Sequence, residues 1–220
     1  MNVLQAIHDA DMFRPFLADQ SRSLASWDHW MAALRCVYGL PSRSRHADLI
    51  LQTTGRTAAS MPSAGFNTCL FLTGRRCGKS KMASVVGAFE AVCVDHSKQL
   101  SPGERGVVPV ISPTRHQSRV MREYLKAIFT TDLLAAEVAS TDRDGFELTP
   151  GIRLDTVTGD FRAVRGFSCV AAIIDEAAFL GYGEDVKVKS DQELVRAVKP
   201  SLATTNGRLL CISAPYAKHG

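Results

Sequence analysis

The stretch Thr73-Gly74-Arg75-Arg76-Cys77-Gly78-Lys79-Ser80 follows a short apolar run and precedes a segment with helical spacing. Gly78 lets backbone N–H groups approach a phosphate, Lys79 supplies a positive charge, and Ser80 supplies a hydroxyl for Mg²⁺. The usual phosphate-loop pattern begins with glycine, where this chain has Thr73. Gly-Lys-Ser/Thr occurs by chance in roughly 10% of chains this long. The prediction of a phosphate loop therefore depends on the strand–loop–helix context, and the alternative is a helix start with a solvated lysine.

A second motif, Cys169-Val-Ala-Ala-Ile-Ile-Asp-Glu-Ala-Ala178, is an apolar run that ends in two acids. A buried parallel strand ending in Asp175 places a carboxylate at the carboxyl edge of the sheet, where ligands bind. We expect Asp175 to hold Mg²⁺ through water beside Ser80, and Glu176 to polarise the attacking water as general base. The alternative is a strand end with two surface acids. The order of the two motifs favours the metal site.

A third motif, Leu209-Leu-Cys-Ile-Ser-Ala-Pro215, is an apolar run that ends in a small hydroxyl residue. Ser213 would lie next to the terminal phosphate of a bound nucleotide and respond to its loss. The alternative is an ordinary strand followed by a turn. Because the first two motifs already predict a nucleotide site, they favour the functional interpretation of Ser213 over the ordinary turn.

From residue 67 onward, apolar runs alternate with helical stretches, which predicts an α/β fold with a mostly parallel sheet and helices on both faces. The motifs specify a P-loop NTPase of the ASCE type. Residues 1–65 are predicted to be a small helical segment, and 66–220 the P-loop core. Pro109 weakens one strand prediction. The predicted strands are Cys69–Leu72, Val107–Ser112, Phe146–Leu148 hairpinned with Ile152–Val157, Val170–Ile174 and Leu209–Ser213; the predicted helices are Ser26–Val37, Lys79–Val94, Arg115–Phe129 and Glu193–Val198.

Bulk composition is that of an ordinary globular chain, with 45% hydrophobic and 22% charged residues. The net charge of +4 permits a nucleic-acid partner without arguing for one. No apolar run is long enough to predict a membrane span, and the first residues show no secretion signal. The six cysteines lack Cys-x-x-Cys spacing and are predicted to be free thiols. Trp27 and Trp30 lie on one helical face and are predicted to be core residues.

Taken together, these motifs resemble the ATPase part of the large subunit of tailed-phage terminases, the DNA-packaging motors. The loop is similar to that family's modified phosphate loop, which tolerates a start other than glycine. The resemblance covers nearly the whole chain, and the order of its motifs is more specific than any one of them. Further similar segments are 26–30, 54–56, 101–107, 111–117, 161–167, 174–179, 199–205 and 210–217.

The resemblance implies a role for each matching residue. Lys79 and Ser80, within a loop of residues 73–80, would bind ATP and Mg²⁺. Asp175 would organise the metal, Glu176 would activate water, and Ser213 would couple hydrolysis to movement. Arg75, or less favourably Arg76, would neutralise charge on the transferred phosphoryl group; either would otherwise pair with an acid or face solvent. Arg162 and Arg165 are alternatives that would act on a neighbouring subunit, and Thr54, Gly55 and Arg56 are expected near the adenine.

The resemblance also implies partners: double-stranded DNA, a portal, a small terminase subunit and a homo-oligomeric ring, in the cytoplasm of a bacterial host and without a membrane. The C-terminal nuclease domain of a complete large subunit is expected to be absent from these residues. Two other interpretations remain open. One is a helicase-like ATPase of other parentage, and the other is a non-catalytic prophage remnant that at most binds nucleotide.

Overall fold

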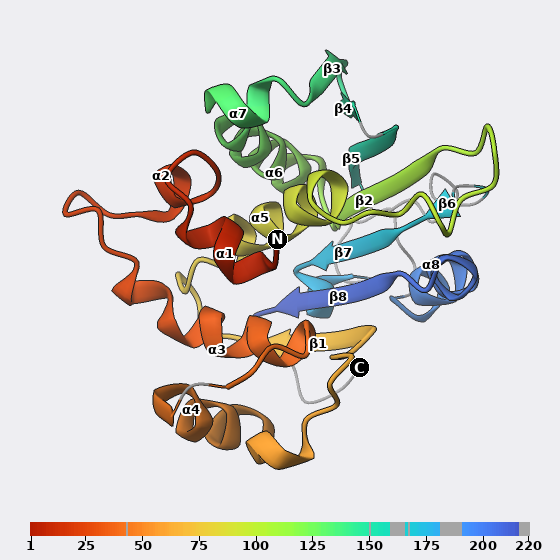
Figure 1. The fold of residues 1–220 in the computed structure, drawn as a ribbon. Helices are drawn as coiled ribbons and strands as arrows, with labels where there is room; N and C mark the ends of the chain where they lie inside the picture. Colours follow the sequence, from red (N-terminus) through yellow and green to blue (C-terminus); the bar gives the residue numbers. More distant parts are fainter. Residues whose placement is uncertain (43, 150, 159–165, 167, 181–190, 216–220) are drawn as a thin grey trace.

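The chain folds around one mixed sheet flanked by two layers of helices (Figure 1). A computed structural model describes residues 1–42, 44–149, 151–158, 166, 168–180 and 191–215. Within these residues the sheet has eight strands in the order β1-β8-β7-β2-β5-β4-β3, with β6 also paired to β2. The strands are β1 (Thr68–Leu72), β2 (Gly106–Ser112), β3 (Val138–Thr141), β4 (Gly145–Leu148), β5 (Ile152–Thr158), β6 (Ser168–Cys169), β7 (Ala171–Asp175) and β8 (Arg208–Ser213).

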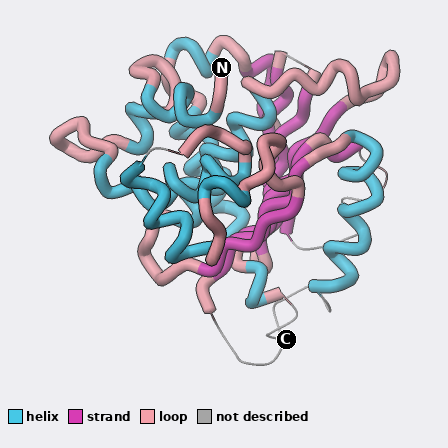
Figure 2. Tube along the Cα trace, turned by 60° about the horizontal axis from the view of Figure 1, so that its bottom comes forward, coloured by secondary structure: helices cyan, strands magenta, loops and turns pink. Residues whose placement is uncertain are grey.

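The helices cover both faces of the sheet, as Figure 2 shows. α5 and α6 pack with the N-terminal helices on one face, and residues from both parts share one buried cluster. α8 covers the other face through Leu194, Val198 and Leu202, which join a second buried cluster with Ile174. The helices are α1 (Val3–His8), α2 (Arg14–Leu17), α3 (Asp28–Val37), α4 (Ser44–Thr54), α5 (Lys79–Val92), α6 (Arg115–Ile128), α7 (Asp132–Ala135) and α8 (Asp191–Thr205).

The parallel part of the sheet brings the carboxyl ends of five strands to one edge. β1, β8, β7, β2 and β5 are all parallel neighbours, whereas β4 and β3 continue the sheet antiparallel. In the register, Leu72 pairs with Ser213, and Ile212 pairs with Asp175. The carboxyl ends of β1, β8 and β7 therefore lie side by side, where ligands bind in α/β sheets. The predicted α/β fold, with a mostly parallel sheet covered on both faces, is confirmed.

Pro109 lies in the interior of β2, which is buried along its whole length. From Val107 to Val110 the strand advances three residues, while its β6–β7 partner advances four, from Cys169 to Ile173. The Val107 carbonyl accepts a bond from the Val170 N–H on that side, and alternate residues of a strand point the same way. Pro109, which has no N–H, therefore faces the β6–β7 segment that contains the extra residue. The hydrogen bonds between the two strands are already interrupted there, so the missing N–H leaves no carbonyl of a regular ladder unpaired.

Several predicted boundaries differ from those in the structure. α8 is longer than the predicted Glu193–Val198 and contains Pro200, and α5 ends at Val92 rather than Val94. The predicted hairpin is present as β4 and β5, but it continues into β3. α1, α2, α4 and α7 were not predicted as helices; α1, α2 and α7 have 6, 4 and 4 residues, too few for a helical period to show. The division at residue 65 stays a prediction. Residues of α1, α2 and α3 belong to the same buried cluster as residues of α5.

Candidate active site

The loop between β1 and α5 requires glycine at position 78. Gly78 has a φ of 80°, in the left-handed region that side chains disfavour. A Cβ on Gly78 would lie 2.5 Å from the Trp27 ring, so the close approach of this ring also excludes a side chain. Gly78 begins α5 without a side-chain cap, which leaves the first N–H groups of a helix of 14 residues available for an anion.

Two tryptophans of the N-terminal segment, Trp27 and Trp30, contact the loop between β1 and α5. Both are buried, as predicted, and Trp30 also tilts against Phe71 of β1. The indole N–H of Trp30 donates a hydrogen bond of 2.8 Å to the carbonyl of Cys77, inside the loop. The indole N–H of Trp27 donates to the Leu17 carbonyl at 2.9 Å. The N-terminal segment thus fixes the loop backbone, a role that helical spacing alone could not reveal.

We expect Trp30→Phe to lower the free energy of unfolding by about 1–2 kcal/mol, because it leaves the Cys77 carbonyl without its buried donor. It should also weaken nucleotide binding, since the loop loses a fixed point. Urea unfolding and nucleotide titration would measure the two effects. Tyr38→Phe is a matched control, because it removes one buried hydrogen bond at the other end of α3. Equal nucleotide affinities in the two variants would contradict this role.

Lys79 is a buried cation at the first position of α5, with 7% of its surface exposed. Its Nζ lies 3.6 Å from Oε1 of Glu176 and donates to the Gly74 carbonyl at 3.4 Å. A buried ammonium needs such partners to offset its lost hydration. The ion pair joins the two residues that the sequence assigned to phosphate binding and to water activation.

Ser80 and Asp175 meet directly across the sheet edge. The Ser80 hydroxyl donates to Oδ2 of Asp175 at 2.9 Å, and Oδ1 accepts from the N–H of Glu176 at 3.1 Å. Burial raises the pKa of Asp175, and the hydrogen bond from Ser80 opposes that rise. A hydroxyl next to a carboxylate is a donor pair suited to Mg²⁺, which prefers oxygen ligands. The predicted metal-binding pair is therefore together, within reach of the loop.

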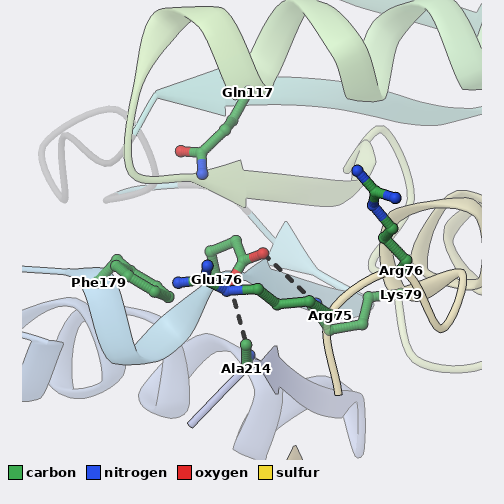
Figure 3. A pocket seen from close by; sticks show the side chains of 7 residues that line it. All are labelled: Arg75, Arg76, Lys79, Gln117, Glu176, Phe179 and Ala214. Atoms are coloured by element: carbon green, nitrogen blue, oxygen red, sulfur yellow. Dashed lines mark hydrogen bonds and ion pairs between the residues drawn. The ribbon is translucent and has the colours of Figure 1, made fainter. Parts of the chain in front are cut away.

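Glu176 adopts a left-handed backbone conformation, with φ 50° and ψ 46°. This conformation costs a non-glycine residue roughly 1–2 kcal/mol, and such strain is concentrated at functional sites. It turns the side chain back toward the loop, so that Oε1 faces Lys79 while Oε2 accepts from the Ala214 N–H at 3.5 Å. Figure 3 shows both contacts. Glu176 thus lies between the loop and the end of β8.

Ser213 links the three strand ends. Its carbonyl accepts from the Thr73 N–H at 2.9 Å, and its hydroxyl accepts from the Ala178 N–H at 3.1 Å. A shift at the end of β8 would therefore reach both the loop and the turn that carries Glu176. The buried hydroxyl of Thr73, the residue in place of the usual glycine, has no hydrogen-bond partner among the described residues.

The loop, the start of α6 and the segments that follow β7 and β8 line an open cavity of about 250 Å³ (Figure 3). Arg75 and Arg76 are exposed at its rim, and neither is paired with an acid in the part of the chain described. Gln117 and Phe179 were not among the predicted site residues. Gln117 comes from the first turn of α6, directly beyond the end of β2. The cavity is lined by Arg75, Arg76, Lys79, Gln117, Glu176, Phe179 and Ala214.

Other predicted residues lie elsewhere. Arg162 and Arg165 fall outside the described residues, as do positions 216 and 217 of the coupling segment. Arg56 lies over the ring of Phe66, 5.2 Å from its centre, just before β1 begins. This is the end of β1 opposite the loop, so the geometry gives the predicted adenine contact at residues 54–56 no support.

Comparison with known proteins identifies the fold. The chain matches no protein-family model and no curated protein. Among solved structures, the ATPase domain of the Thermus phage P74-26 large terminase is 19% identical, with a TM-score of 0.52, over 80% of this chain and 70% of that chain. The HK97 bacteriophage large terminase is 13% identical, with a TM-score of 0.50, over 69% of this chain and 29% of that chain.

This chain has the fold of a phage large-terminase ATPase domain. The family resemblance seen in the sequence motifs is thereby confirmed at the level of the fold. The chain spans less than a third of the HK97 large terminase that it matches. Within the described residues, none of the helices of this terminase-type fold has the length and apolarity needed to span a membrane.

Proposed function

We propose that the chain is the ATP-binding and ATP-hydrolysing motor domain of a phage terminase large subunit, which drives double-stranded DNA into a procapsid. One observation carries the proposal: Lys79, Ser80, Asp175 and Glu176 converge at the carboxyl edge of a sheet with the terminase ATPase fold. These residues come from two segments far apart in the sequence. Charged and hydroxyl groups at such an edge are what phosphoryl transfer requires.

Each residue has a distinct part in the proposed reaction. Lys79 exchanges its partner Glu176 for the β- and γ-phosphates, while the uncapped start of α5 donates N–H groups to the same anion. Ser80 and Asp175 would hold Mg²⁺, which when bound neutralises charge on the β- and γ-phosphates. Arg75 would add charge compensation from the rim of the cavity. Residues 73–80 together form the proposed phosphate cradle.

Glu176 is the proposed general base. Released from Lys79, its carboxylate accepts a proton from a water molecule aligned with the γ-phosphorus. Ser213 then couples the reaction to movement, because it bonds to both the loop and the turn after Glu176. By the same resemblance, the motor would act on double-stranded DNA with a portal, a small terminase subunit and a homo-oligomeric ring, in a bacterial host.

The proposal predicts slow Mg²⁺-dependent ATP hydrolysis by the purified chain. Lys79→Ala should abolish both hydrolysis and nucleotide binding, because the phosphates lose their buried counter-charge. Phosphate release and nucleotide titration are the measurements. Lys98→Ala, at an exposed loop position, is the matched control and should behave as the wild type. Nucleotide binding without turnover in the wild type would support a non-catalytic remnant, and strand separation would support a helicase-like ATPase.

A further inference from the structure

Gln117 is a polar residue that lines the cavity and has no part in the proposed reaction. The other lining residues come from the loop, α5 and the segments that follow β7 and β8, whereas Gln117 comes from α6. Figure 3 shows its side chain extending from the first turn of α6 toward Glu176, across the cavity from the loop. Gln117 therefore forms a wall of the cavity that is separate from the phosphate-binding elements.

A hydrogen-bond pair with Thr114 orients the amide of Gln117. Thr114 caps α6, because its Oγ1 accepts from the Gln117 backbone N–H at 3.3 Å. The same hydroxyl donates its single proton to the amide oxygen of Gln117 at 3.0 Å. The amide oxygen is thus held at Thr114, and the NH₂ group, a pure donor, is left for the cavity. The amide nitrogen lies on the side of Glu176 in Figure 3.

A neutral donor suits this place in the cavity. Three cations, Arg75, Arg76 and Lys79, already line it, so its electrostatic character favours an anion. Lys79 and Ser80 lie at the start of α5, where the β- and γ-phosphates of a nucleotide would be held from the side of the loop. Gln117 lies across from them, with its side chain directed toward Glu176, the residue that would activate water (Figure 3). A donor at that position would contact the outermost phosphate of a triphosphate, which a diphosphate lacks.

We propose that the Gln117 amide donates a hydrogen bond to the terminal phosphate of a bound nucleoside triphosphate, and that Thr114 is its positioning residue. The proposal rests on the proposed function and deepens it. It makes Gln117 the group by which the site distinguishes a triphosphate from a diphosphate. Because Gln117 and Thr114 begin α6, loss of the terminal phosphate would also remove a contact that holds this helix end.

The test compares Kd values for ADP and for a non-hydrolysable ATP analogue, both with Mg²⁺, by calorimetric titration. Gln117→Glu keeps the size of the side chain but replaces the donor with a negatively charged acceptor. We expect it to weaken analogue binding by about 10-fold or more while changing ADP binding by less than about 3-fold. Glu at this position also suits a helix capped by threonine, so α6 should stay folded. Gln52→Glu, exposed on α4, is the matched control.

Variants of Thr114 test the positioning role. Thr114→Ser keeps the hydroxyl and should keep the wild-type ratio of the two Kd values. Thr114→Val loses the hydroxyl and should lower the preference for the triphosphate, with less effect than Gln117→Glu. A merely structural role would lower the thermal midpoint and both affinities together, which leaves the ratio unchanged.

The outcomes separate this proposal from the proposed function. Wild-type protein that prefers the analogue, and loses that preference in Gln117→Glu alone, supports it. Wild-type binding with an unchanged ratio in Gln117→Glu would overturn the Gln117 assignment and leave the ATPase proposal intact. Wild-type protein that binds neither nucleotide would overturn both.

Discussion

Glu176→Gln should reduce the rate of ATP hydrolysis by about 10²–10⁴-fold, the usual contribution of a general base. ATP affinity should stay at or above the wild-type value, because the amide no longer competes with phosphate for the Lys79 ammonium, 3.6 Å away. The substitution keeps the size of the side chain and its acceptor for the Ala214 N–H. Single-turnover hydrolysis and nucleotide titration would measure the two quantities separately.

The control for this experiment is Glu123→Gln on the exposed side of α6, where the carboxylate pairs with Lys126 in the next turn. Its rate and affinity should match those of the wild type. A wild-type rate in Glu176→Gln would show that another group accepts the proton. A joint loss of rate and affinity would instead mean that the carboxylate maintains the shape of the loop.

Much of the fold could be predicted because its central strands are apolar on both faces. β7 and β8 are apolar runs of mostly buried residues, whereas β1, at the edge of the sheet, is an apolar run whose residues alternate between exposed and half-buried. Such runs indicate covered parallel strands whatever lies around them. The residues after β7 and β8 were therefore predicted correctly at the carboxyl edge. Chain order alone could not predict that β8 lies between β1 and β7.

The rest of the site depends on contacts between distant segments. Trp30 and Cys77 are far apart in the sequence, and their hydrogen bond appears only when α3 packs under the loop. In the sequence, Gln117 has the pattern of an ordinary helix residue. The order of the strands in the sheet is what places α6 next to the cavity. The left-handed backbone of Glu176 could not be predicted, because glycine is the usual sequence sign of that conformation and this position is a glutamate. These features arise from tertiary packing, which outweighs local propensity.

A second large effect is expected at the opposite end of α5, where Glu90 is buried with 0% of its surface exposed. The Tyr38 hydroxyl donates to its Oε1 at 2.7 Å, and the Arg208 guanidinium lies 3.5 Å from the same oxygen. Arg208 also lies over the Tyr38 ring, 4.6 Å from its centre. Burial raises the pKa of Tyr38, so this hydroxyl stays a donor. The cluster joins α3, α5 and the start of β8.

Arg208→Met should lower the free energy of unfolding by about 3–5 kcal/mol, because it leaves a buried carboxylate without its guanidinium partner. Urea unfolding would measure the loss. Arg105→Met is the matched control: Arg105 pairs with Glu147 but is 64% exposed, and exposed pairs contribute roughly 0–1 kcal/mol.

Adding Glu90→Gln to Arg208→Met should recover part of the loss, since an amide still accepts from Tyr38 but carries no charge to bury. No recovery would mean that Arg208 stabilises the fold through its stacking on Tyr38 instead of through its charge. A loss no larger than that of Arg105→Met would show that His96, whose Nε2 lies 3.8 Å from Oε2 of Glu90, compensates the carboxylate without help.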